Sequence, residues 1–192
     1  LSMEQRMTIC NMSIEAGSRA GLIAPDEKAF DYINNREYTP KNYDQLVDTW
    51  KDNLMSDTNA KFDKSFTIDV EKIEPQVSWG TNPAMVSDVT GTVPTPEEFG
   101  QSNEIQIESA KKALVYMNLE PETPIVEIHI DRVFIGSCTN ARLEDLKDAA
   151  EIVKGKTVNP DVNAMIVPGS QMVKHEAEKL GLDKIFKDAN FE

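Results

Sequence analysis

The sequence is poor in cysteine, and this shortage excludes a protein held together by disulfides. Two of its 192 residues are cysteines, Cys10 and Cys138. A disulfide framework of the kind that stabilises small secreted domains needs more of them. Free thiols are typical of a reducing compartment, so we expect a cytoplasmic protein.

Long apolar runs and an excess of basic residues are also missing. Apolar residues make up 40% of the chain, yet no run approaches the roughly 20 residues that a transmembrane helix needs. Lys and Arg number 20 against 33 Asp and Glu, which gives a formal net charge of −13. Nucleic acids and anionic membranes are bound through basic surfaces, so neither is an expected partner. An anionic substrate would have to be captured by local cations.

The first two thirds of the chain predict helices, loops and one strand. Apolar side chains recur at helical spacing in four segments, which are residues 3–14, 25–33, 43–50 and 105–119. Residues 66–70 alternate apolar and polar side chains, which predicts a strand. Pro121 and Pro124 then interrupt the pattern, so we place a domain boundary after residue 122.

The last third predicts alternating strands and helices. Apolar runs at 133–135 and 164–167 each precede a segment of helical periodicity, at 143–153 and 173–180. This order implies parallel strands joined by right-handed crossovers, the arrangement of an α/β fold. Two strands alone do not make a stable parallel sheet, so we expect the chain to be a piece of a longer protein.

A cysteine follows the first of these two strands. Gly136, Ser137 and Cys138 come directly after the apolar run, and the helix begins near Leu143. Ligands collect at the carboxyl ends of parallel strands, and a helix N-terminus favours the thiolate that binds metal. We therefore expect Cys138 at a strand tip, partly open to solvent. The alternative is a small buried cysteine, since free cysteine is among the most buried residue types.

Two motifs resemble a known superfamily. Residues 134–140, Phe-Ile-Gly-Ser-Cys-Thr-Asn, resemble the first cluster-ligand motif of the aconitase superfamily. The continuation 141–146, Ala-Arg-Leu-Glu-Asp-Leu, is similar to the large subunits of 3-isopropylmalate dehydratases, although Ser or Gly is commoner at the first position. Residues 7–17, Met-Thr-Ile-Cys-Asn-Met-Ser-Ile-Glu-Ala-Gly, resemble the segment that brings an Asn and a Glu to the cluster. Residues 77–83 resemble the linker of the same subunits.

The resemblance implies an aconitase-like, three-layer α/β/α fold with parallel strand–helix units. Residues 1–122 would be part of an aconitase-like α/β domain, and residues 123–192 the first half of the following cluster-bearing α/β domain. The implied function is that of a [4Fe–4S] hydro-lyase that isomerises 2-isopropylmalate to 3-isopropylmalate by dehydration and rehydration in leucine biosynthesis. Its partners would be a small-molecule dicarboxylate substrate and a small subunit carrying the swivel domain. A homoaconitase-type or related hydro-lyase and a non-catalytic structural fragment are the alternatives.

The resemblance also implies roles for five residues. Cys138 would bind one iron of the cluster, and Glu15 would act on the iron-bound hydroxyl or water. Substrate contacts are implied for Asn11, Asn140 and Arg142. Without the resemblance, Glu15 would be interpreted as a solvated helix carboxylate and Arg142 as a surface arginine at a helix start.

The other thiol and the histidines have plainer interpretations. Cys10 falls on the apolar face of the first predicted helix, which predicts a core position. His129 and His175 are isolated histidines without metal-ligand spacing. Because a cluster is held by several thiolates, we expect the chain alone to hold none and to be inactive.

Overall fold

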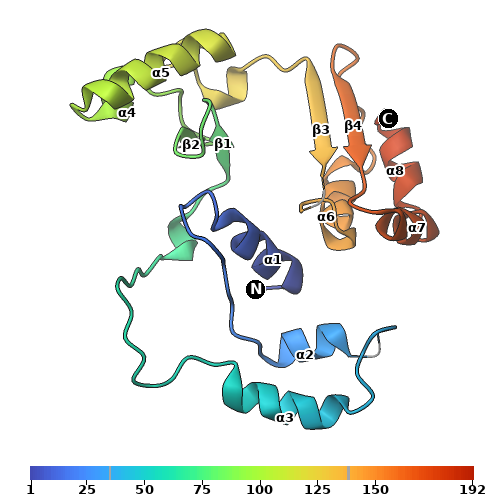
Figure 1. Cartoon of the computed structure of the whole chain (residues 1–192). Coiled ribbons are helices and arrows are strands. Elements are labelled where there is room, and N and C mark those ends of the chain that lie inside the picture. The colour runs from blue at the N-terminus through green and yellow to red at the C-terminus, as the bar shows by residue number, and fades with distance from the viewer. Residues whose placement is uncertain (35, 138) are drawn as a thin grey trace. The chain divides into compact units, whose positions relative to one another are not determined.

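The computed structural model combines helices and short strands in two compact units (Figure 1). It describes residues 1–34, 36–137 and 139–192. The outer unit comprises residues Leu1–Phe62 and Asp131–Glu192, and the middle unit comprises Asp63–Ile130. The two ends of the sequence therefore belong to the same unit.

The outer unit begins with three helices: α1 (Met3–Met12), α2 (Glu27–Ile33) and α3 (Tyr43–Asn53). All three were predicted by their apolar periodicity, although α1 ends two residues before Ile14. Ser2 starts α1 with a capping box, and Asp26 starts α2 by accepting the backbone N–H groups of the first turn. The Phe30 ring of α2 is buried against Trp50 of α3, with ring centroids 6.2 Å apart.

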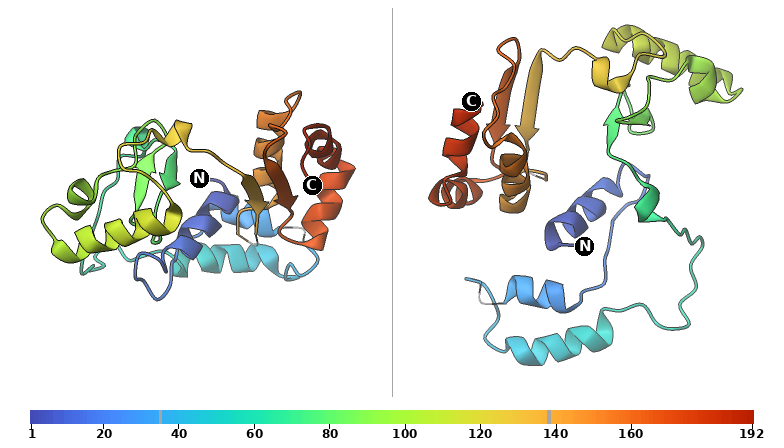
Figure 2. Two further views of the ribbon diagram at one scale, coloured as in Figure 1. Left: turned by 90° about the horizontal axis from the view of Figure 1, so that it is seen from above. Right: turned by 180° about the vertical axis from the view of Figure 1, so that it is seen from behind.

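The rest of the outer unit is a strand–helix repeat, which Figure 2 shows from two further sides. Its elements are β3 (Arg132–Gly136), α6 (Leu143–Val153), β4 (Asn163–Val167), α7 (Gln171–Lys179) and α8 (Leu182–Asp188). The two strands are parallel, as predicted, and pair from Arg132 with Asn163 to Gly136 with Val167. On the other side of β4, Phe191 forms a parallel bridge with Ala164. A mixed α/β arrangement is confirmed, whereas the three-layer α/β/α arrangement stays a prediction.

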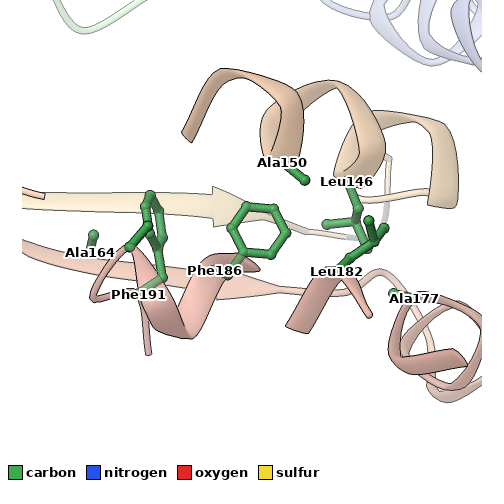
Figure 3. Close-up of a cluster of buried hydrophobic side chains, with 8 residues drawn as sticks. Leu146, Ala150, Ala164, Ala177, Leu182, Phe186 and Phe191 are labelled. Atoms are coloured by element: carbon green, nitrogen blue, oxygen red, sulfur yellow. The ribbon is translucent and has the colours of Figure 1, made fainter. Parts of the chain in front are cut away.

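Three helices and β4 enclose the core of this repeat (Figure 3). Its buried side chains are Leu146, Ala150, Ala164, Ala177, Leu182, Phe186, Ala189 and Phe191. Phe186 and Phe191 meet edge to face with ring centroids 5.6 Å apart, a favourable aromatic geometry. Helix α8 supplies both Leu182 and Phe186, and the sequence analysis did not predict this helix.

The middle unit has its own core. The hairpin of β1 (Gln76–Ser78) and β2 (Val86–Asp88) is antiparallel, and α4 (Pro96–Gly100) precedes α5 (Glu104–Met117). The buried core residues are Trp79, Met85, Val93, Ala110, Ala113, Leu114 and Ile125. The prediction of a helix near 105–119 is confirmed by α5. None of the helices among the described residues is long and apolar enough to cross a membrane.

The strand predicted at residues 66–70 is wrong. Phe66, Ile68 and Val70 are 84%, 69% and 72% exposed, and Val70 opens a one-turn 3₁₀ helix, Val70–Lys72. A strand needs hydrogen bonds from a neighbouring strand, and within the described part of the chain no strand pairs with this segment. The segment therefore alternates apolar and polar side chains, but among the described residues it has no neighbouring strand that would stabilise it as a strand.

The compact units do not follow the boundary that we placed after residue 122. Residues of the segment 123–130 pack with the middle unit: Ile125 is buried in its core, and Pro124 forms a bridge with Thr92. The boundary between 122 and 123 stays a prediction about the domains of the family protein.

Replacing Leu146 by Ala should destabilise the strand–helix repeat by about 2–5 kcal/mol, because a fully buried leucine leaves a cavity that only partly collapses. Leu146 is 2% exposed, whereas Met172 on α7 is 71% exposed. The measurement is the opening free energy of the β3 and β4 amides by hydrogen exchange. Met172→Ala is the control and should change that free energy by no more than about 0.5 kcal/mol.

Candidate functional site

The loop after β3 is fixed by close backbone packing. A Cβ added at Gly136 would lie 2.6 Å from the carbonyl oxygen of Val167, so only glycine allows the two strand ends to approach in this way. Ser137 follows with a φ of +92°, in the left-handed region. Cys138, the predicted cluster ligand, lies outside the described residues, so its predicted position at the strand tip stays a prediction.

The same loop is bonded to the loop after β4. The N–H of Gly169 donates to the carbonyl oxygen of Ala141 at 2.9 Å, and Ala141 is completely buried. Burial explains why a small residue occupies position 141. Arg142 then caps α6 with an extended backbone, and its N–H donates to the Asp145 carboxylate at 3.0 Å. This bond fixes the direction in which α6 leaves the loop.

Side chains of this loop contact α1. Asn140 Nδ2 donates to Thr8 Oγ1 at 3.4 Å, and Arg142 Nη1 donates to the carbonyl oxygen of Glu4 at 3.5 Å. Both bonds are long and weak, but they join the two motifs that the sequence analysis singled out. Residues 7–17 and 134–140 therefore meet in one unit of the fold.

A cavity of about 300 Å³ lies where α1, the segment before α2 and the loop after β3 come together. It is lined by Met3, Arg6, Met7, Cys10, Asn11, Ile23, Ala24, Pro25, Ala29, Thr139 and Arg142. Two of the predicted substrate contacts, Asn11 and Arg142, are among these residues. Thr139, which follows Cys138 in the sequence, also lines this cavity.

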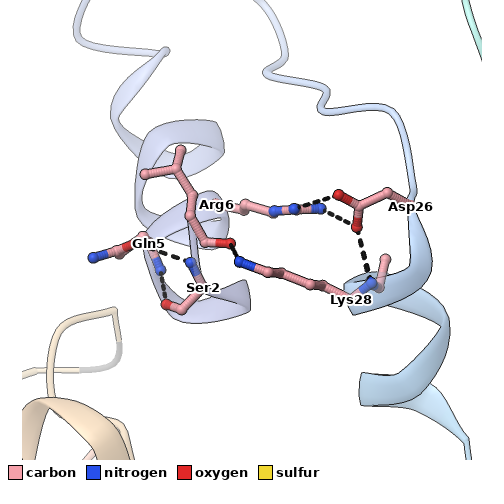
Figure 4. Close-up of polar contacts among 7 residues, drawn as sticks. Ser2, Gln5, Arg6, Asp26 and Lys28 are labelled. Carbon is pink, nitrogen blue, oxygen red and sulfur yellow. Dashed lines mark hydrogen bonds and ion pairs between the residues drawn. The ribbon is translucent and has the colours of Figure 1, made fainter. Parts of the chain in front are cut away.

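An ion pair joins the walls that α1 and α2 contribute to this cavity (Figure 4). The two terminal nitrogens of Arg6 donate to the two carboxylate oxygens of Asp26 at 2.7 and 2.6 Å. This bidentate geometry is the strongest form of an Arg–carboxylate contact. The hydrogen bonds from Arg6 lower the pKa of the Asp26 carboxyl to about 2, and the pKa of Arg6 is raised in turn. The charge of Arg6 is therefore neutralised locally.

The chain between α1 and α2 is held close to α1. A Cβ added at Gly21 would lie 2.7 Å from the Cα of Cys10, so a side chain at this position would push the segment away. Ile23, Ala24 and Pro25, which follow after Leu22, form one wall of the cavity. Cys10 was predicted to lie in a core; it is instead half-buried and lines the cavity, because its helix face meets this wall rather than a packed interior.

The structure does not bring every predicted residue to the cavity. Glu15 is exposed in the turn that follows α1, and its N–H donates to the carbonyl oxygen of Met12 at 3.2 Å. Asn140 is exposed and reaches Thr8 rather than the cavity wall. Sequence reasoning missed Arg6 and Ile23 as cavity residues. The sequence Pro25-Asp26 was a signal that could have indicated this role of Arg6. An aspartate that starts one helix can also form an ion pair with an arginine of a neighbouring helix.

A larger cavity of about 650 Å³ lies beside β4, α7 and α8. Its lining includes the core residues Leu146, Phe186 and Phe191, and its two lysines, Lys174 and Lys187, pair with carboxylates. No predicted site residue lines it. We therefore assign the candidate site to the smaller cavity, where the two motifs meet.

Comparison with protein families identifies the class of protein. All of residues 1–192 match the aconitase family, described as aconitate hydratase. The chain belongs to the aconitase family. This membership supports a hydro-lyase type of function in general and agrees with the mixed α/β structure.

The family implies a [4Fe–4S] cluster, but the donor set of this chain does not fit one by itself. Across residues 1–34, 36–137 and 139–192 no three His, Cys, Asp or Glu side chains form a group that could hold a metal. The complete sequence has two cysteines, and Cys10 lies in the first helix rather than in the cluster motif. A cluster needs more thiolates than these two.

The Arg6–Asp26 pair should give the outer unit a pH dependence at low pH. An unpaired aspartate titrates near about 3.9. Because the folded pKa is lower, at about 2, the pair stabilises the fold above about pH 4 and this stabilisation is lost as the pH falls towards 2. Carboxyl NMR titration of Asp26 should give a midpoint near 2 that rises towards the ordinary value in Arg6→Gln. In the control Lys28→Gln, whose ammonium contacts the carbonyl of Leu1, the midpoint should stay low.

Proposed function

We propose that this chain is part of the large subunit of a hydro-lyase that interconverts 2-isopropylmalate and 3-isopropylmalate, a reaction of leucine biosynthesis. Family membership supports the reaction type, and the similarity of residues 134–146 supports the substrate. The observation that carries the proposal is the cavity of about 300 Å³, which is lined both by residues of α1 and by Thr139, the residue after Cys138 in the sequence. A swivel-domain small subunit is the proposed partner.

Arg142 is the proposed site for a substrate carboxylate. Its guanidinium lines the cavity and donates to a backbone carbonyl rather than to a carboxylate, so its charge is not neutralised by that contact. A local cation of this kind is needed because the chain carries a formal charge of −13 and repels anions as a whole. Arg142 also stands at the start of α6, where the backbone dipole favours negative charge.

Two asparagines are proposed to orient the substrate. Asn11 lines the cavity from α1, and Asn140 lies one residue after the cavity residue Thr139. An amide offers both a donor and an acceptor, so it can hold a hydroxyl or a carboxylate without adding charge. Such contacts fix which face of the substrate loses and regains water.

Glu15 is the proposed acid–base residue. It follows Asn11 by four residues and is exposed, so its carboxylate is free of the packing that would fix it in a core. Dehydration requires one proton to be taken from carbon and the leaving hydroxyl to receive another, and a carboxylate can carry either proton. In the assembled enzyme the cluster would supply a Lewis acid. Cys138 is our proposed ligand from this chain, and further thiolates would have to come from outside these 192 residues.

Glu15→Gln should leave the assembled enzyme folded and its cluster intact but lower the turnover of 2-isopropylmalate by ~10²–10⁴-fold. The amide has the size of the carboxylate but cannot exchange a proton. Visible absorption of the cluster is compared with the rate of product formation. Glu151→Gln, which changes an exposed residue of α6, is the matched control and should keep full turnover. Unchanged turnover in Glu15→Gln would return this residue to a solvated surface carboxylate.

The isolated chain should not take up a stoichiometric cluster. Anaerobic reconstitution followed by iron and acid-labile sulfide analysis measures the content. We expect far less than four irons per chain, because two cysteines cannot supply the thiolates. Four irons on a monomer would contradict the view that the remaining ligands lie elsewhere.

A further inference from the structure

We infer that Thr8 is a positioning residue, which orients the amide of Asn140 through a hydrogen bond between the two side chains. The inference rests on the proposed function, which gives Asn140 a substrate contact, and adds the residue that holds its amide in place. Thr8 lies within α1 and is not among the described residues that line the cavity. Its effect on the reaction is therefore exerted through Asn140.

One face of α1 meets the loop after β3. Glu4, Thr8 and Asn11 follow one another at helical spacing, so they share this face. The carbonyl oxygen of Glu4 accepts from Arg142 Nη1 at 3.5 Å, and the hydroxyl oxygen of Thr8 accepts from Asn140 Nδ2 at 3.4 Å. Asn11 lines the same cavity as Arg142. The loop therefore uses three successive positions of one helix face, and Thr8 is the middle one.

Both hydrogen bonds from the loop end on the same turn of the helix. In an α-helix the N–H of residue 8 is directed at the carbonyl of residue 4, so Arg142 and Asn140 bind on either side of this backbone bond. Two attachments fix a loop against a helix in position and in rotation, which one attachment cannot do. Asn140 supplies the attachment that depends on the side chain of the helix residue.

The hydroxyl is the fixed partner of this pair and the amide is the group that it orients. Thr8 is half-buried on a helix, where a β-branched side chain has few rotamers, whereas Asn140 is exposed. The bond uses one N–H of the amide and so sets the plane of the whole group. The second N–H and the carbonyl oxygen of Asn140 are then held in set directions, as a substrate contact requires.

The test is a double-mutant cycle in the assembled enzyme. Thr8→Val removes the hydroxyl but keeps the shape and nearly the same helix propensity, so α1 itself should be unaltered. The kcat/KM for 2-isopropylmalate, expressed per intact cluster from visible absorption, should fall about two- to tenfold, as expected for losing one hydrogen bond. In an Asn140→Ala background the same Thr8→Val change should lower kcat/KM no further.

The control variants separate the hydroxyl from the rest of the side chain. Thr8→Ser keeps the hydroxyl and should retain most of the kcat/KM, whereas Thr8→Ala should resemble Thr8→Val. Thr49→Val is the matched control on α3. The hydroxyl of Thr49 donates to the carbonyl oxygen of Gln45 in its own helix at 3.1 Å, so its removal should leave kcat/KM unchanged.

The outcomes separate this inference from the proposed function. If the unaltered enzyme converts 2-isopropylmalate and Thr8→Val has no effect, or the same effect with and without Asn140, the inference is wrong while the proposed function stands. If the enzyme converts a different hydroxy acid instead, the proposed substrate is wrong, and the same cycle with that acid decides the role of Thr8. A loss in Thr8→Val that is absent from Thr8→Ser and vanishes without Asn140 supports the inference.

Discussion

The arrangement of the candidate site depends on the bidentate ion pair between Arg6 and Asp26. Asp26 accepts from Arg6 on α1 and also caps α2, so one carboxylate fixes the start of a helix and its position against another. The intervening chain, held at Gly21, is thereby kept against α1 and becomes a cavity wall. A partly exposed pair of this kind contributes little to overall stability, so its importance lies in geometry rather than in free energy.

A second constraint acts at the carboxyl ends of the parallel strands. Gly136 allows β3 to approach Val167, and the N–H of Gly169 bonds to the carbonyl oxygen of the buried Ala141. These contacts leave no room for a side chain at Gly136 and little for a larger one at Ala141, on either side of Thr139 and Asn140. The cavity thus has one wall fixed by an ion pair and another fixed by backbone packing, which is the usual means of holding polar groups in a set geometry.

Local signals in the sequence predicted most helices and the parallel strands, because caps and apolar spacing act over a few residues. Ser2 and Asp26 mark helix starts, and the face of Leu146 is buried as its spacing implies. The segment 66–70 misled because a strand depends on a partner that its own residues do not encode. Helix α8 was missed because Gly181 marks the end of one helix and the start of the next. The motifs pointed to Asn11 and Arg142, which both line the cavity. The contact between Arg6 and Asp26 joins residues 20 positions apart, so it depends on the fold and not on a local motif.

The two arginines that line the candidate site differ in their hydrogen-bond partners. Arg6 and Arg142 line the same cavity, but Asp26 neutralises one, whereas the other meets a backbone carbonyl. On the proposed function, a substrate carboxylate would therefore pair with Arg142 rather than with Arg6. Because Asp26 already takes both terminal nitrogens of Arg6, a ligand carboxylate would gain little by binding beside that guanidinium.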